Sequence, residues 1–403
     1  MKSVSLVGTV GLLAAAAFVV VGCGVGEQGS DAVASQDQAI HKSNGPKVTP
    51  QQSGTDKGLI AVSALNSRVV WASGRSGTYA VTTNGGKTWH SGVVSGAEIV
   101  QFRDVEAVSE KVAYLLSVPT SPPNPFVPSR IYKTTDGGKT WKLQFEAAAD
   151  QFHDCFSFWD PWTGLDFADS VGDRFPAVRT FDGQSWHDYG DHLPTPLPGE
   201  AGFASGGTCI ATQGQRRAWI TTGVQPSTPD GLWTTRVFYS TDRGRSWGVA
   251  TAPITAGPGP DSAGGGFSIA FRDARHGILA GGDLGASGVV NNFARSRDGG
   301  RTWELTTPAP IPGAIFTTAY AGHGTGHDGW GGDDEDGFEE HDHGEGPSIR
   351  VVATAPTGTA WSPDEGRTWN LIAGLSGLWG VDFGSQQTGW LVGTSGQIVR
   401  IDF

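Results

Sequence analysis

The sequence predicts an all-β fold, a seven-bladed β-propeller of four-stranded antiparallel blades, and three observations support this prediction. A turn motif recurs six times, with its tryptophans 45 to 66 residues apart, which is the length of a propeller blade rather than of a solenoid coil. The composition, with 61 glycines, 15 tryptophans and many β-branched residues, favours short strands and tight turns. The last predicted strands also lack an outer partner, which an N-terminal strand could supply.

The first element along the chain is an expected secretory signal over residues 1–22. Lys2 precedes an apolar run from Val4 to Val21, and Gly22 then precedes Cys23 in the pattern that bacterial lipoprotein processing recognises. We expect cleavage before Cys23 and lipidation of its thiol, which would hold the protein on a membrane leaflet. The alternatives are an ordinary signal peptide with a chance cysteine, and an uncleaved anchor helix. The short apolar run favours cleavage.

Residues 23–46 are expected to form a flexible tether. They are rich in Gly, Ser, Gln and Asp and contain few large apolar side chains, so they cannot bury enough surface to offset the entropy of ordering. The predicted location is that of an exported bacterial lipoprotein of the cell envelope, facing the periplasm or the outer surface. The propeller itself is expected over residues 47–403.

The recurring turn combines Asp or Asn, glycine, Ser or Thr, and Trp. Its copies pair Asn84 with Trp89, Asp136 with Trp141, Asp182 with Trp186, Asp242 with Trp247, Asp298 with Trp303, and Asp364 with Trp369. This is the Asp-box, in which a short side chain bonds its own turn, glycine supplies positive φ, and Trp packs as the next strand begins. The third copy is one residue short and the first carries Asn, so both are degenerate. The role predicted for these residues is structural.

A second pattern lies between the boxes and completes the blades. Segments 158–167, 271–281 and 383–393 each read as a strand, a polar turn and a second strand. Six complete blades follow from this register, and residues 378–403 supply three further strands without an outer partner. A strand near residues 47–52 would close the seventh blade and remove exposed sheet edges.

With these repeats in place, the sequence resembles the photosystem II stability and assembly factor family, which carries BNR-type Asp-box repeats, and its non-photosynthetic bacterial relatives. The likeness rests on the boxes and on the C-terminal patterns at 377–383 and 389–393. It implies a seven-bladed propeller that assists the assembly of another protein. It implies no catalytic residues and no cofactor.

Glycoside hydrolases also contain Asp-boxes, so a sialidase-like enzyme or a glycan-binding propeller is the alternative function. The chain lacks a recognisable Arg-Ile-Pro-like motif and a tyrosine nucleophile beside a glutamate. Paired carboxylates remain a candidate because the repeat register places five acidic residues around one channel, namely Asp104, Glu106, Asp154, Glu200 and Asp273. We favour a non-catalytic binding or assembly scaffold for an exported or membrane protein.

Residues 323–346 do not fit the repeat and are expected to project from the sixth blade as an insertion. The segment contains four histidines and nine acidic residues, and no Lys or Arg. His323, His327, His341, Asp342 and His343 offer ligands for Zn²⁺, Ni²⁺ or Cu²⁺, although no rigid spacing organises them. The favoured interpretation is a solvated acidic loop.

The formal charge of −12 comes mainly from that insertion and no basic stripe is present, so nucleic-acid binding is not expected.

Cys155 and Cys209 fall on the inner strands of consecutive blades, where a disulfide and two buried thiols are equally good interpretations. Arg103, Arg174 and Arg272 are candidates for binding a partner's carboxylates. The alternative is that each arginine bonds a turn carbonyl or an adjacent aspartate.

Overall fold

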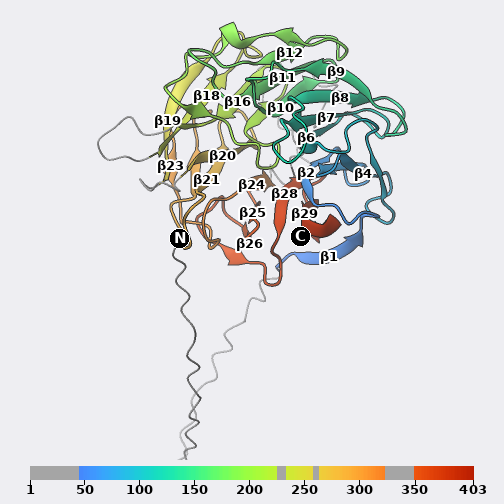
Figure 1. Ribbon diagram of the computed structural model, residues 1–403. Coiled ribbons are helices and arrows are strands. Elements are labelled where there is room, and N and C mark those ends of the chain that lie inside the picture. The colour runs from blue at the N-terminus through green and yellow to red at the C-terminus, as the bar shows by residue number, and fades with distance from the viewer. Residues whose placement is uncertain (1–44, 225–232, 257–262, 323–348) are drawn as a thin grey trace, which may run out of the picture. The chain divides into compact units, whose positions relative to one another are not determined.

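The fold is a closed ring of β-sheets in a computed structural model that describes residues 45–224, 233–256, 263–322 and 349–403. The compact unit Asn44–Phe403 contains seven sheets whose inner strands contact one another in cyclic order (Figure 1). The predicted all-β, seven-bladed propeller is therefore confirmed. The predicted signal and Cys23 lie outside the described residues, as does the 323–346 insertion.

Six blades follow one another along the chain, each running from its inner to its outer strand. Blade 1 comprises β2 (Leu59–Ala64), β3 (Val70–Gly74), β4 (Thr78–Thr82) and β5 (His90–Val93). Blade 2 comprises β6 (Gln101–Ala107), β7 (Ala113–Val118), β8 (Arg130–Thr134) and β9 (Lys142–Glu146). Blade 3 comprises β10 (His153–Asp160), β11 (Thr163–Ala168), β12 (Val178–Thr180) and β13 (His187–Asp188), followed by the 3-10 helix η1 (Gly190–His192).

Blade 4 departs from the four-strand pattern because two short strands are added to it. Its main strands are β15 (Ile210–Gln213), β16 (Arg217–Thr221), β18 (Trp233–Ser240) and β19 (Gly248–Ala256), and β14 (Glu200–Ala201) pairs with β17 (Gly223–Val224) at its end. Blade 5 comprises β20 (Gly264–Phe271), β21 (Gly277–Asp283), β22 (Phe293–Ser296) and β23 (Glu304–Leu305). Blade 6 comprises β24 (Thr317–Tyr320), β25 (Val351–Ala355), β26 (Gly358–Ser362) and β27 (Asn370–Leu371).

Blade 7 is built from both ends of the described unit. It contains β28 (Leu378–Phe383), β29 (Thr388–Gly393), the 3-10 helix η2 (Thr394–Gly396) and β30 (Gln397–Asp402), and its outer strand is β1 (Lys47–Gln52). β1 pairs antiparallel with β30 from Lys47 opposite Asp402 to Gln52 opposite Gln397, and the two strands lie side by side in Figure 1. The predicted closing strand is therefore confirmed.

A single glutamine on β1 links the two sides of this closure. Oε1 of Gln51 accepts hydrogen bonds from the indole of Trp89 in blade 1, at 2.9 Å, and from that of Trp390 in blade 7, at 3.2 Å. Asp382 of blade 7 also accepts the backbone N–H of Ala64 in blade 1 at 2.7 Å. We call the β1–β30 pairing that closes the ring the seam. Beside it, hydrogen bonds join blade 7 to blade 1.

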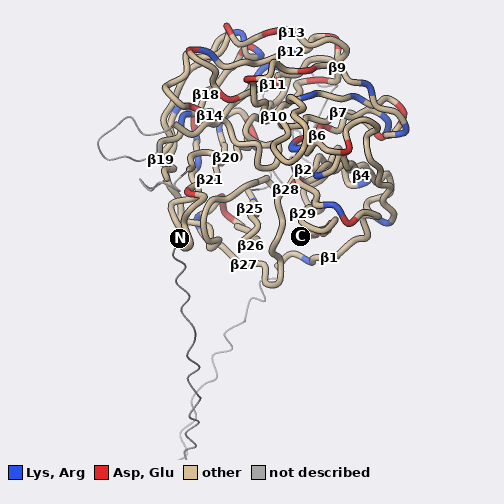
Figure 2. Tube along the Cα trace, viewed as in Figure 1, with Lys and Arg blue, Asp and Glu red and all other residues tan. Residues whose placement is uncertain are grey.

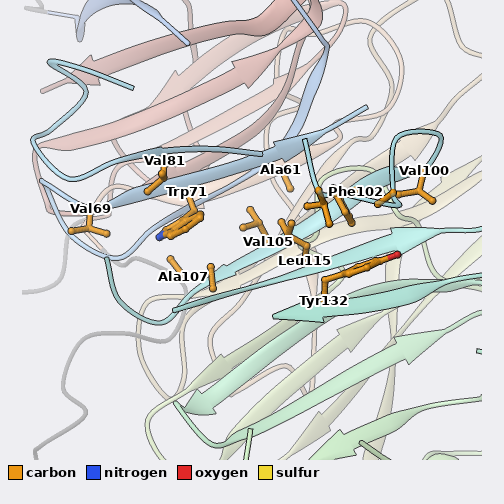
Figure 3. Packing of buried hydrophobic residues seen from close by; sticks show 13 residues of the cluster. Ala61, Val69, Trp71, Val81, Val100, Phe102, Val105, Ala107, Leu115 and Tyr132 are labelled. Atoms are coloured by element: carbon orange, nitrogen blue, oxygen red, sulfur yellow. The ribbon is translucent and has the colours of Figure 1, made fainter. Parts of the chain in front are cut away.

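The hydrophobic core lies between neighbouring blades. The cluster in Figure 3 joins Trp71 of blade 1 to Val105 and Leu115 of blade 2, and all three side chains are buried. Complete burial of a large side chain contributes roughly 2–3 kcal/mol. Because each inner blade surface is covered by the next blade, removal of one blade would expose apolar side chains on two others.

One backbone hydrogen bond recurs on the face that carries the Asp-boxes. In all six boxes an N–H within the box donates to a carbonyl in the inner hairpin turn of the same blade, at 2.7 to 3.1 Å. The six pairs run from Gly85 with Arg68, through Gly137 with Lys111, Gly183 with Trp162, Arg243 with Arg216 and Gly299 with Arg275, to Glu365 with Ile349. We call this side of the ring the Asp-box face, and the opposite side, where the inner strands begin, the channel-mouth face.

Candidate functional site

The channel-mouth face gains its distinctive side chains from one irregularity repeated in five inner strands. Near their starts, strands β2, β6, β10, β20 and β28 each skip one residue in their pairing with the second strand. The skipped residues are Ile60, Arg103, Asp154, Phe267 and Trp379. Such a bulge re-aims a side chain. Arg103 of blade 2 lies over the Trp379 ring of blade 7, so these residues meet although blade 1 separates their blades.

Trp379 is the centre of an aromatic and cationic cluster. The guanidinium carbons of Arg103 and of Arg75, in the β3–β4 turn, lie 5.4 Å and 5.7 Å from the Trp379 ring centre. The ring of Phe316 lies edge-on to that of Trp379, with the ring centres 5.1 Å apart. Burial and the positive charge of Arg75 lower the pKa of Arg103 to about 10. We call Arg75, Arg103, Phe316 and Trp379 the mouth cluster.

A segment between β14 and β15, residues 202–208, fills the channel beneath this cluster. The carbonyl of Ala204 accepts a hydrogen bond from Arg103 at 2.9 Å, and the hydroxyl of Ser205 donates to the carbonyl of Phe316 at 2.9 Å. One segment of blade 4 thus bonds blades 2 and 6. We call residues 202–208 the plug.

Two glycines allow the plug to pass through the channel. A Cβ atom on Gly206 would lie 2.5 Å from Oγ1 of Thr317. Gly207 has φ of +79°, and a Cβ atom there would collide with the carboxylate of Asp104. Any larger residue would strain the backbone and displace an inner strand.

Buried acidic groups hold the N-terminal half of the plug. Asp169 accepts the N–H of Gly202 at 2.9 Å, and Asp154 is bonded to the backbone of Ala204. Burial raises the pKa of Asp169 to about 6, and burial together with the charge of Asp169 raises the pKa of Asp154 well above its usual range. Behind them the buried ring of His153 contacts one carboxylate oxygen of Asp166.

The five acidic residues expected around one channel are in fact dispersed. Asp104, Glu106 and Asp154 lie on the inner strands β6 and β10. Glu200 instead lies in β14 and pairs with Arg236, and Asp273 lies in a turn on the Asp-box face. The expectation was wrong for these two, because β14 is an added strand and Asp273 follows the end of its inner strand.

A disulfide between Cys155 and Cys209 anchors the other end of the plug. Cys155 lies on β10 and Cys209 directly follows the plug, with the two Cα atoms 6.1 Å apart. Both side chains are fully buried. The plug is therefore fixed to blade 3 at its C-terminal end by a covalent bond.

The three arginines selected from the sequence lie in three different places. Arg103 belongs to the mouth cluster, whereas Arg174 pairs with Asp188 at 2.9 Å and Asp191 at 3.0 Å beside a hollow of about 320 Å³ lined by Phe145, Trp186 and Val178 among others. Arg272, on the Asp-box face, pairs with Asp273 at 2.8 Å and Glu365 at 2.6 Å. They do not form one cluster.

The Asp-box residues form the turns expected of them. Asp136 accepts the N–H of Thr140 at 2.9 Å and the hydroxyls of Thr134 at 2.9 Å and Thr140 at 2.6 Å. These bonds lower the pKa of Asp136 to about 2. Asp242, Asp298 and Asp364 make the same three contacts, Asn84 makes the equivalent bond to Thr88, and the short third box closes on Ser185 through Asp182.

The box tryptophans lie at the start of the outer strands. Trp89 is buried, and Trp141, Trp186, Trp247, Trp303 and Trp369 are half-buried. Indole N–H groups of Trp247 and Trp303 donate to glycine carbonyls of their own boxes, at 3.1 and 3.0 Å. Each of these two tryptophans therefore stabilises its own turn.

The metal-ligand candidates His323, His327, His341, Asp342 and His343 lie outside the described residues. Within the described ranges no group of three His, Cys, Asp or Glu side chains is placed to hold a metal ion. A search of the same ranges found no helix long and apolar enough to cross a membrane.

Comparisons with known proteins support the repeat and the fold. A family model described as BNR/Asp-box repeat matches residues 132–143, which span the second box. A search of curated protein sequences found no match. A solved structure described as YCF48 bound to D1 peptide superposes with a TM-score of 0.54 at 14% identity, over 89% of this chain and 97% of that chain.

Two further solved structures were found in the same comparison. YCF48 from Cyanidioschyzon merolae superposes with a TM-score of 0.53 at 14% identity, over 88% of this chain and 98% of that one. A Hadza microbial sialidase, Hz136, gives a TM-score of 0.48 at 12% identity, over 82% and 72% of the two chains. The chain thus carries a BNR/Asp-box repeat and is similar in fold to YCF48, as the sequence motifs predicted.

Proposed function

We propose that this protein is an exported, membrane-tethered scaffold that binds another protein through its channel-mouth face. The observation that carries the proposal is the mouth cluster, in which two guanidinium groups from different blades lie over one indole ring. Arg103 is largely buried and faces the like charge of Arg75, so an incoming carboxylate would relieve the repulsion. Arginine and tryptophan are also the residues that dominate protein interfaces.

The structural neighbour supports a protein partner. YCF48 has been captured with a D1 peptide, and this chain shares its propeller fold at 14% identity. We infer that this chain likewise binds an extended segment or a terminus of an exported protein, with Arg75 and Arg103 bonding its carboxylates. Lipidation at Cys23 and the tether over residues 23–46 would keep the scaffold at the membrane where such a partner is inserted.

Glycan hydrolysis has one observation in its favour, which is the pair of Asp154 and Asp169 with raised pKa values. Both carboxyl groups, however, are bonded to the backbone of the plug. Their position is better explained by retention of the plug than by attack on a substrate. Protein binding is therefore the function that we put forward.

The test is a pull-down from membranes with the full, lipidated chain and a matched pair of variants. R75Q/R103Q removes the two cations of the mouth cluster, whereas R68Q/K87Q removes two exposed cations from the Asp-box face. We expect the wild type and R68Q/K87Q to retain the same partner and R75Q/R103Q to lose it, with circular dichroism confirming that all three are folded. Equal recovery by all three would refute the proposed surface.

A further inference from the structure

A second surface, on the Asp-box face, is distinguished by its arginines. In blades 4 and 5 the two inner hairpin turns (213–217 and 271–276) and the two Asp-boxes (241–247 and 297–303) each contribute two arginines, eight in all. The same segments contain three aspartates and no lysine or glutamate, which leaves an excess of five positive charges. Most of the chain trace is uncharged (Figure 2), so this concentration is a local feature.

The aspartates among them are engaged inside their own turns. Asp242 and Asp298 close their boxes, and Asp273 accepts the N–H groups of Arg275 and His276 at 2.8 Å. The side chains of Arg216, Arg245, Arg275, Arg297 and Arg301 are by contrast exposed, and among them Arg297 lies 3.7 Å from the carboxylate of Glu304. We call these five residues the arginine rim.

Hydrogen bonds from side chains to backbone carbonyls link the Asp-boxes of blades 4 and 5 to the preceding blades. The indole N–H of Trp219, in blade 4, donates to the carbonyl of Gly299, in the box of blade 5, at 2.9 Å. Arg179 of blade 3 donates to the carbonyl of Arg243, in the box of blade 4, at 2.5 Å. These bonds fix the backbone of the two boxes from which the exposed arginines project.

Two exposed aromatic side chains extend the rim into blade 3. Trp162 is 59% exposed and Phe181 is 55% exposed. They lie in neighbouring turns, because the carbonyl of Trp162 accepts the N–H of Gly183 at 2.9 Å. Exposed aromatic rings beside arginines are typical of surfaces that meet a membrane interface, where ring and cation lie at headgroup depth.

The tether enters the propeller on this same face. Lys47, the first residue of β1, pairs with Asp402 at the end of β30. The next residue, Phe403, donates its N–H to the carbonyl of Gln387 in the hairpin turn of blade 7 at 2.9 Å, which is the bond that the boxes make in the other blades. The chain preceding β1 therefore leaves from the Asp-box face.

From these observations we infer that the Asp-box face of blades 3 to 5 is a membrane-docking surface, on which the arginine rim binds the phosphates of anionic lipids and Trp162 and Phe181 enter the headgroup layer. Arginine suits phosphate because its planar fork bonds two oxygens at once. This orientation of the propeller, with its Asp-box face on the membrane, rests on the proposed lipid tether. It leaves the channel-mouth face free for the partner.

The test uses unlipidated residues 24–403, which include the whole compact unit Asn44–Phe403. Co-sedimentation is measured with phosphatidylcholine vesicles, with and without about one phosphatidylglycerol in three lipids, at about 0.05 M and 0.5 M salt. We expect binding to the anionic vesicles alone, with loss at high salt. Equal binding to neutral vesicles would overturn the inference.

Matched variants locate the surface. R245Q/R297Q is expected to weaken vesicle binding by about tenfold or more, because each basic residue near an anionic surface contributes roughly fivefold. K57Q/K142Q removes the same charge from exposed lysines elsewhere and should leave binding unchanged. W162A/F181A should weaken binding to anionic vesicles several-fold at both salt concentrations. Equal losses in the two charge variants would contradict the assignment.

Two further experiments distinguish binding of lipid from binding of other anions and from binding of the proposed partner. Binding of polyglutamate or inorganic phosphate without binding of anionic vesicles would overturn the lipid assignment. The assay is repeated with 323–346 deleted, since that acidic segment belongs to blade 6, and vesicle binding should then be at least as strong. R75Q/R103Q should bind vesicles normally, so failure of the partner proposal and failure of this one give different results.

Discussion

Aspartates on the two faces of this propeller occupy opposite electrostatic environments. On the Asp-box face Asp136 accepts hydrogen bonds from its own turn in contact with water, and its pKa falls to about 2. On the channel-mouth face Asp169 is buried beside Asp154, and its pKa rises to about 6. The repeated aspartates thus stabilise turns as anions, whereas the aspartates that occur once hold a plug and favour the neutral form.

The largest expected effect concerns the covalent anchor of the plug. Replacing both cysteines, as C155S/C209S, should lower the free energy of unfolding by about 4 kcal/mol, because the disulfide closes a loop with a sequence separation of 54. Urea unfolding of wild type and variant, each with and without reductant, measures the loss. The double variant should be insensitive to reductant, and a wild type that loses no stability on reduction would contradict the structural role of the bond.

A smaller effect is expected when the plug is enlarged by one methyl group. G207A should cost about 3 kcal/mol, because the new Cβ adds a collision with Asp104 to the strain of positive φ. G96A is the matched control, since Gly96 has φ of +78° but no atom within 4 Å of the added Cβ, and it should cost only about 1 kcal/mol. Equal costs in denaturant unfolding would mean that the plug is loosely packed.

The contributions of Asp169 and Asp136 to the free energy of unfolding should depend on pH in opposite directions. The folded pKa of Asp169 is raised, so the stability associated with its neutral form is present below about pH 4 and is lost as pH rises through about 6. The expected loss is about 3 kcal/mol, and D169N should remove most of it. The folded pKa of Asp136 is lowered, so its contribution is present above about pH 4 and disappears as pH falls through about 2.

Unfolding free energies of wild type, D169N and D136N between about pH 2 and pH 8 check both directions. D136N should remove the pH dependence between about pH 2 and pH 4, and D169N should remove the pH dependence above about pH 4. A wild-type profile that is flat from pH 4 to pH 7 would contradict the burial of the Asp154 and Asp169 pair.

The smallest effect is expected for a single Asp-box. D298A should cost about 1 kcal/mol, because it removes hydrogen bonds to the N–H and hydroxyl of Thr302 in an exposed turn. D298N should be nearly neutral, since Asn84 already accepts the equivalent N–H of Thr88 in the first box at 3.0 Å. Thermal melts of both variants test this, and a cost for D298N equal to that for D298A would show that the charge itself matters.

The fold was predictable from the sequence because its determinants are local and repeated. Each box aspartate contacts residues two before and three or four after it, so the pattern is visible in a short window. The closing strand was predictable for a different reason, since three strands without an outer partner required a fourth. The extra pair β14 and β17 had no such signal, because each strand is only two residues long.

Most of the mouth cluster and the plug could not be predicted from the sequence. Their bonds join residues about a hundred positions apart, as between Arg103 and Ala204 or between Ser205 and Phe316, and no periodicity connects them. One signal was available, since Arg103, Asp154 and Trp379 occupy the same register position in three inner strands. Comparing that position across blades, rather than searching for motifs, would have selected Trp379 together with Arg103.

The seam of the ring has a mechanical consequence. Because the chain enters β1 at Lys47, tension on the preceding residues is carried by the same six residue pairs that close the ring. A pull on Lys47 away from the Asp-box face acts along the length of β1, so the hydrogen bonds to β30 share the load instead of opening one after another. The first described strand is thus also the joint that keeps the ring closed under such a pull.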